Sequence, residues 1–157
     1  MDQNISQLLE KLRDEDETVR QSATAQLWQI WFQQKGVWGL EQLRRAQKLV
    51  EQGNFKQAED LLTEVIEDNP TFAEARNRRA VLYYLQGKYE KSRADCSQVV
   101  AFNQFHFGAW HGLGLCNAAL GNYHDAIAAF RKALKIQPYA LTNQKLILEC
   151  TAKLTEG

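Results

Sequence analysis

The chain has 157 residues, and its 19 basic and 19 acidic side chains give a formal net charge of zero. Because nucleic-acid affinity depends on neutralising phosphates, this balance disfavours a nucleic-acid-binding protein. No apolar run approaches the ~18 residues of a membrane span, and the first residues lack the basic and apolar regions of a secretory signal. We therefore expect a protein of the cytoplasm or of the soluble interior of an organelle.

Two helices are predicted at the start of the chain. Ile5, Leu8, Leu9 and Leu12 recur at helical spacing and form one apolar face. A second helix is predicted from about residue 16 to about residue 34, and its apolar stripe comprises Val19, Ala23, Leu27, Ile30 and Trp31. Gly36 is expected to end it. Residues 1–38 should therefore form a helical extension that packs on the rest of the chain, most simply on the segment directly after it.

Three glycines, Gly53, Gly87 and Gly121, recur every 34 residues. An aromatic residue follows each of them two positions later, and a small residue follows five positions later. A fixed period of this length is typical of stacked helix–turn–helix units. We predict three repeats, residues 39–72, 73–106 and 107–140, each with two helices joined at the glycine, where a left-handed backbone costs glycine little.

The repeat resembles the tetratricopeptide repeat over about residues 39–140. The third unit carries the fullest set of family positions: Trp110, Leu113, Gly114, Tyr123, Ala126, Phe130, Ala133 and Pro138. The resemblance implies an all-α fold, a right-handed α-solenoid of helix–turn–helix units. Residues 73–80, 92–96 and 106–114 are also similar to a small group of bacterial and plastid repeat proteins, which implies a prokaryotic or organellar origin.

After the repeats, residues 141–157 are predicted to form a capping helix. Stacked repeats leave an open apolar end, and a terminal helix closes it. Leu141, Leu148 and Ala152 lie on one side of this helix. The chain thus divides into an N-terminal extension, three repeats and a C-terminal cap.

In this family the first helix of each unit lines a concave groove, so the resemblance implies a binding surface there. Carried onto this sequence, the groove residues are Leu43, Gln47, Val50, Glu74, Asn77, Val81, Tyr84, His111 and Leu115. An apolar surface with a few hydrogen-bonding groups suits an amphipathic helix or an extended peptide. Alternatively, the segment Ile5–Leu12 itself occupies the groove, because apolar surface of that size is usually covered.

Two arginine doublets, Arg44–Arg45 and Arg78–Arg79, lie one repeat apart. Arg45 and Arg79 stand where the family usually has leucine, and a charge there must find a partner or reach solvent. We favour ion pairs with acids of the second helices, notably Asp60, Glu64 and Asp95. The alternative is that Arg44, Arg78 and Arg79 contact phosphate or an acidic segment of a partner.

Some members of the family bind the C-terminal carboxylates of heat-shock chaperones through lysine, asparagine and arginine side chains. The corresponding positions here are Leu43, Gln47, Arg78, Gly108 and Gly112. Because that set of polar groups is missing, we expect no chaperone-tail binding of this type.

No catalytic or metal-binding arrangement is recognisable in the sequence. Neither the histidines nor the cysteines have the spacing of zinc ligands or of a nucleophile–base pair; they are His106, His111, His124, Cys96, Cys116 and Cys150. The thiols are expected to be small core residues between helices. We expect no enzyme activity, no metal and no cofactor.

These patterns predict a non-enzymatic scaffold or adaptor that binds a partner protein or peptide in the concave groove. The alternative is a self-assembling structural protein, a homodimer formed through the repeat ends or through the Trp-rich N-terminal region with Trp28, Trp31 and Phe32. A third hypothesis, an RNA-binding helical repeat, is opposed by the neutral charge and the apolar groove.

Overall fold

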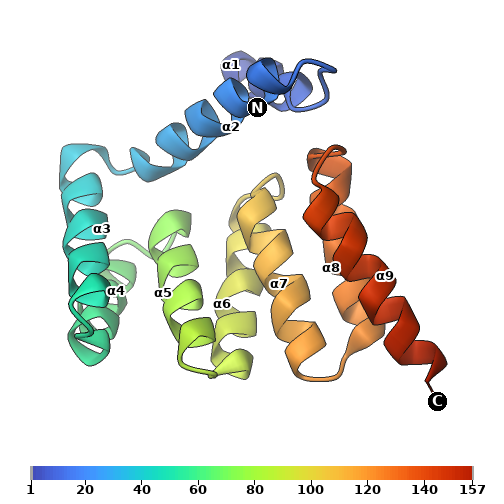
Figure 1. Ribbon diagram of the computed structural model, residues 1–157. Helices are drawn as coiled ribbons and strands as arrows, with labels where there is room; N and C mark the ends of the chain where they lie inside the picture. The colour runs from blue at the N-terminus through green and yellow to red at the C-terminus, as the bar shows by residue number, and fades with distance from the viewer. Residues whose placement is uncertain (1, 157) are drawn as a thin grey trace.

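The repeats stack as pairs of antiparallel helices in the computed structural model, which describes residues 2–156 (Figure 1). The pairs are α3 (Gly36–Glu51) with α4 (Phe55–Asp68), α5 (Ala73–Leu85) with α6 (Tyr89–Phe102), and α7 (Phe107–Ala119) with α8 (Tyr123–Ile136). A final helix, α9 (Leu141–Thr155), packs on α8 at the end of the stack. The predicted all-α solenoid is therefore confirmed. No described helix is both long and apolar enough to cross a membrane.

The turn inside each repeat is built on its glycine. Gly53, Gly87 and Gly121 have φ angles of 78°, 73° and 81°, in the left-handed region. In each turn the residue after the glycine donates its N–H to a carbonyl five residues earlier, as from Asn54 to Leu49 at 2.8 Å. This pattern satisfies carbonyl groups at the helix end and fixes the angle at which the next helix leaves.

Small residues bring the second helix of each repeat close to the first. Ala58 and Ala126 are fully buried, and Ser92 takes the same place in the second repeat. The Ser92 hydroxyl donates to the Ala80 carbonyl at 2.7 Å, so this buried polar group is satisfied. The three repeats therefore share one packing scheme, with a hydroxyl in place of a methyl group in the middle unit.

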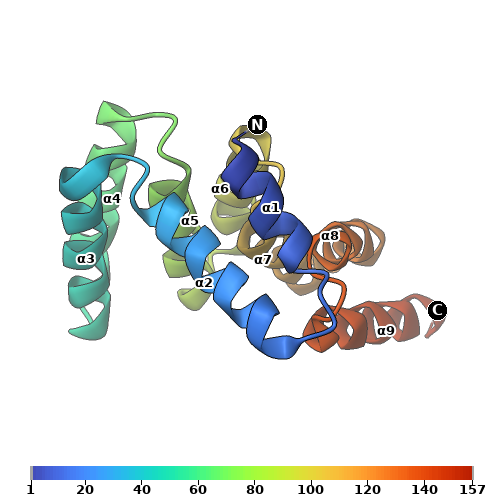
Figure 2. The same ribbon diagram turned by 90° about the horizontal axis from the view of Figure 1, so that it is seen from above.

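The N-terminal hairpin consists of α1 (Gln3–Lys11) and α2 (Glu17–Phe32). It lies across the edge of the stack at which each repeat passes to the next (Figures 1 and 2). Asp2 and Asp16 cap the two helices through their carboxylates. The apolar faces of the helices meet in a cluster that includes Leu8, Leu27 and Trp31 together with Phe107 of α7. The hairpin therefore spans several repeats.

Two expectations about this hairpin are corrected. It does not simply cover the first repeat, since Trp28 packs so closely on Gly108 that a Cβ there would lie 2.6 Å from the indole ring. Nor does Ile5–Leu12 fill the groove, because Leu8 and Leu12 pack with α2, Phe107 and Ile136. The aromatic face of α2 finds its apolar partner at the start of α7, far along the chain.

The first helix of the first repeat begins before residue 39, where the 34-residue period places the start of the unit. The third helix begins at Gly36, directly after α2 and a short turn. Gly36 has a φ of 64°, so it reverses the chain with few connecting residues. The Trp38 side chain is consequently half-exposed on the first turn of α3 rather than part of the extension.

Candidate functional site

The first helices of the repeats, α3, α5 and α7, contact one another along the stack and form its inner face. Between α3 and α5 this face holds a hollow of about 200 Å³, which we call the groove pocket. Three residues expected in the groove line it, Gln47, Val50 and Val81, together with Arg78, which was expected as an anionic contact. Leu85, one turn beyond Val81, completes the rim.

The groove pocket has a buried apolar floor and an exposed apolar rim. Ala46, Leu62 and Leu82 in the floor are at most 2% exposed. Val81 and Leu85 on the rim are 46% and 63% exposed. Fully burying one large aliphatic side chain contributes about 1.5–3 kcal/mol. The pocket therefore offers a place for such a side chain from outside.

A fixed positive charge borders this pocket. The Arg78 guanidinium lies 3.4 Å from a carboxylate oxygen of Glu74 and 4.7 Å from the centre of the Phe32 ring. Because Glu74 is buried and Phe32 belongs to α2, the arginine is held between the repeats and the hairpin. Its charge is partly compensated, so it orients a partner's polar group more than it adds net attraction.

Three of the expected groove residues are covered rather than open. Leu43, Glu74 and Asn77 are at most 6% exposed. They belong to the first half of α3 and the first turns of α5, where Phe32 and the rest of α2 pack on the repeats. A partner therefore meets only the second half of these helices while the hairpin is in place.

A buried polar network lies beneath α2. The Ala109 N–H donates to His106 Nδ1 at 3.0 Å, so the ring hydrogen is on Nε2 and is donated to Glu74 at 2.9 Å. Asn77 also donates to Glu74, at 3.3 Å. Trp31 stacks on the His106 ring with centroids 4.5 Å apart. Through these contacts, the first turns of α5 and α7 attach the hairpin to the repeats.

The remaining groove residues form a half-buried strip on α5 and α7. Tyr84 lies against Tyr89, with ring centroids 5.3 Å apart. His111 hydrogen-bonds Asn143 of α9 at 2.7 Å, and Leu115 packs against the core beside α8 and α9. The structure brings Gln47, Val50 and Val81 together at the groove pocket. It places His111 and Leu115 on α7, one repeat further along the stack.

The four arginines have different roles in the structure. Arg79 forms two hydrogen bonds with Asp95, at 2.7 and 2.8 Å, and these raise the pKa of the guanidinium. It also donates to Thr63, so it is a structural ion pair that joins α5 to α4 and α6. Arg45 instead hydrogen-bonds Gln42 on its own helix, and Arg44 is exposed. Arg44 and Arg78 therefore remain the candidates for an anionic contact.

The three cysteines are free and buried. The Cys116 thiol donates to Ser92 at 3.2 Å, and contact with Cys116 together with burial raises the pKa of Cys96. Within residues 2–156 no group of three or more histidine, cysteine or acidic side chains is arranged to hold a metal ion.

Reasoning from the sequence did not find the residues that close the upper end of the groove. Trp31 and Phe32 set that boundary, and both lie outside the repeats. The only signal was the aromatic concentration at Trp28, Trp31 and Phe32, which the repeat pattern does not explain. That signal indicates that these side chains are buried, but it does not specify the surface against which they pack.

The fold and the concave face together define an α-solenoid of helix–turn–helix repeats. Sequence models described as tetratricopeptide repeat match residues 43–105 and 108–139. A TPR repeat-containing protein of Rhizobium etli is 30% identical over 153 residues, which cover 97% of this chain and 75% of that protein. The chain therefore belongs to the tetratricopeptide repeat family.

Solved structures of low identity share this fold. The first TPR domain of Spaghetti (RPAP3), bound to the HSP90 peptide SRMEEVD, superposes with a TM-score of 0.71 at 22% identity, over 74% of this chain and 92% of that one. The second TPR domain of human RPAP3, in complex with the HSP70 peptide SGPTIEEVD, gives 0.67 at 20% identity, over 71% and 93%. At these identities the likeness is one of fold.

Proposed function

We propose that this protein is a non-enzymatic adaptor that binds a short segment of a partner protein across the open half of its concave face. One aliphatic side chain of the partner enters the groove pocket, and Arg78 orients a neighbouring polar group. The observation that carries this proposal is the pocket itself, with a floor of buried residues below the exposed Val81 and Leu85. The proposed setting is the cytoplasm or the soluble interior of an organelle.

Structures of the same fold with bound peptides support the general mode of binding. Their peptides end in acidic residues, which suits a cationic groove. The corresponding positions here include the buried Leu43, the neutral Gln47 and only one cation, Arg78. We therefore propose an aliphatic anchor and expect no binding of a chaperone tail.

Peptide display with random sequences tests this proposal without a known partner. Selected peptides should share one large aliphatic residue and should bind in a calorimeter. The double substitution Val81→Glu/Leu85→Glu should abolish that binding, because it places two charges on the apolar rim, while stability changes within about 0.5 kcal/mol since both residues are exposed.

The matched control is Leu141→Glu/Leu148→Glu on α9, where the two leucines are 73% and 70% exposed. It changes the same chemistry away from the groove and should leave peptide binding intact. Peptides that bind the Val81/Leu85 variant as tightly as the wild type would show that the groove pocket is not the site.

The second candidate function is self-association through the ends of the stack. Trp28, Trp31 and Phe32 pack inside the molecule, so a dimer through that face would require the hairpin to open. Leu141 and Leu148, by contrast, leave an exposed apolar stripe on α9. If they join two copies, light scattering should show a dimer that Leu141→Glu/Leu148→Glu converts to a monomer. A concentration-independent monomer mass for the wild type would remove this candidate.

A further inference from the structure

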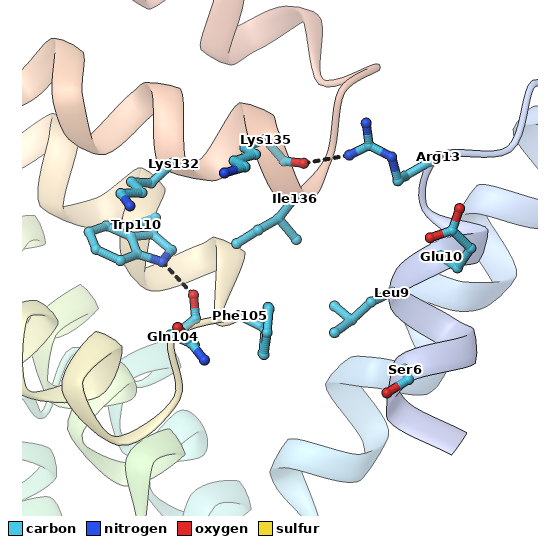
Figure 3. Close-up of a pocket in the computed structure, with 10 residues that line it drawn as sticks. All are labelled: Ser6, Leu9, Glu10, Arg13, Gln104, Phe105, Trp110, Lys132, Lys135 and Ile136. Atoms are coloured by element: carbon cyan, nitrogen blue, oxygen red, sulfur yellow. Dashed lines mark hydrogen bonds between the residues drawn. The ribbon is translucent and has the colours of Figure 1, made fainter. Parts of the chain in front are cut away.

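A second hollow lies away from the groove, between the N-terminal hairpin and the third repeat. It has a volume of about 380 Å³ and is formed by α1, the connection between α6 and α7, and α7 and α8 themselves (Figure 3). We call it the hairpin pocket. None of the groove residues lines it, so neither the proposed peptide site nor the repeat pattern accounts for it.

The floor of the hairpin pocket is apolar. Leu9, Phe105, Trp110 and Ile136 line it, and each is half-buried. The indole N–H of Trp110 donates to the Gln104 carbonyl at 2.7 Å, so the polar atom of this ring is already satisfied. What the ring presents to the pocket is therefore hydrophobic surface, which a ligand's apolar part can remove from water.

The rim of the hairpin pocket is cationic. Arg13, Lys132 and Lys135 line it against one acid, Glu10, although the chain as a whole has no net charge. Figure 3 shows the two lysines on one side of the hollow and Arg13 on the other. Arg13 donates one N–H to the Lys135 carbonyl at 2.8 Å, which fixes the guanidinium while its other N–H groups can still meet a carboxylate.

We propose that the hairpin pocket binds a small anionic amphiphile, a medium-length apolar chain that carries one carboxylate. The chain lies on the Leu9, Phe105 and Ile136 surface, and the carboxylate meets the cationic rim. The volume falls in the range of about 300–1,000 Å³ that is usual for small-molecule sites. The excess of cations over acids selects an anion, and the floor selects its apolar part.

A peptide segment fits this pocket less well than an alkyl chain. Each peptide unit brings an N–H and a C=O that must be hydrogen-bonded when it leaves water. Only two uncharged polar side chains, Ser6 and Gln104, line the pocket, and the backbone carbonyl of Gln104 is already bonded to Trp110. An alkyl chain has no such requirement.

Binding here should also strengthen the attachment of the hairpin. The lining comes from α1 on one side and from α7 and α8 on the other, so a ligand contacts both. A molecule that binds only when these surfaces are together stabilises that arrangement in proportion to its occupancy. Amide exchange in α1 should therefore slow when the pocket is filled.

The test uses decanoate, hexanoate and decylamine, titrated calorimetrically into the full chain at concentrations below aggregation. Decanoate should bind saturably and about tenfold or more tighter than hexanoate, because each buried methylene contributes about 0.8 kcal/mol. Decylamine should not bind saturably. Lys132→Glu/Lys135→Glu should weaken the binding of decanoate about tenfold or more. The control, Lys88→Glu/Lys145→Glu, reverses the charge of two exposed lysines outside the pocket and should change decanoate binding little.

Hydrogen exchange locates the ligand, with slower exchange in α1 expected on adding decanoate. Equal binding of decylamine and decanoate, equal loss in the two lysine variants, or slowed exchange confined to the concave helices would each overturn the proposal. So would saturable binding of an acidic, leucine-rich peptide at Trp110 when decanoate shows none.

Discussion

The two halves of the concave face differ although the same repeat builds both. On the first turns of α5, Glu74 and Asn77 are buried beneath α2 and belong to the network around His106. On the last turns of the same helix, Val81 and Leu85 are exposed beside the groove pocket. Family position alone assigns Glu74, Asn77 and Val81 to one groove. The hairpin buries Glu74 and Asn77, where they contribute to stability, and leaves Val81 and Leu85 open for binding.

This difference shows how an extension can set the length of a binding groove. The repeats supply an inner face along whole helices, and α2 covers its upper part with Trp31 and Phe32. The covered part holds charged and polar groups that are satisfied internally, whereas the open part is largely aliphatic. A partner therefore finds a shorter and more apolar surface than the family pattern implies.

The largest effect should come from removing the aromatic ring that attaches the hairpin to the repeats. Trp31→Ala deletes a buried indole that stacks on His106 and packs against Phe107 at 5.1 Å between centroids. We expect a loss of about 3–5 kcal/mol in the free energy of unfolding, as for other buried aromatic-to-alanine changes. Urea denaturation gives the magnitude, and amide exchange should rise first in α1 and α2.

Trp38→Ala is the matched control, since Trp38 is 46% exposed on the first turn of α3. Its cost should be about 1 kcal/mol or less. Similar losses for the two tryptophans would mean that the hairpin is not anchored through Trp31, and the distinction between a covered and an open half would fail.

A smaller loss is expected from the buried carboxylate of the covered half. Glu74→Ala leaves the His106 Nε2–H, the Asn77 amide and Arg78 without their common acceptor. Stranding buried donors in this way should cost about 2–3 kcal/mol in a urea unfolding experiment. Glu74→Gln retains an acceptor oxygen, so its cost should be about 1 kcal/mol.

An exposed acid provides the comparison for Glu74. Asp60 pairs with Lys56 at 2.9 Å on the surface, where the two side chains are 63% and 79% exposed. Asp60→Ala should change stability by less than about 0.5 kcal/mol. If both acids cost the same, the Glu74 network carries no more free energy than a surface ion pair.

The sequence was sufficient to predict the repeats, but it did not predict where the N-terminal hairpin packs on them. Every turn glycine and the small residues Ala58, Ser92 and Ala126 could be assigned, because the constraints on them are local and recur with the period. The position of α2 could not, since an amphipathic helix reveals which face is buried and not which surface buries it. The hairpin pocket was missed for the same reason, because Leu9 and Ile136 meet only through that packing.

The smallest effect on stability should come from a contact between α5 and α4, which supports the open half of the concave face where no helix covers it. Tyr83, which follows the pocket residue Leu82 on α5, donates its hydroxyl to Glu59 of α4 at 2.9 Å. Burial and this hydrogen bond raise the pKa of Tyr83 from 10.0 to about 12. Because the protonated phenol is favoured in the folded state, its contribution is complete below pH 10 and declines as the pH rises towards 12.

Tyr83→Phe should therefore cost about 1 kcal/mol near neutral pH, the usual net value of one hydrogen bond. The difference between the variant and the wild type should shrink from about pH 10 upward, when urea unfolding is measured at several pH values. A difference close to zero at every pH would mean that the aromatic ring, which Tyr83→Phe keeps, ties α5 to α4 without help from the hydroxyl. The open half would then be held by apolar packing alone, as the covered half is not.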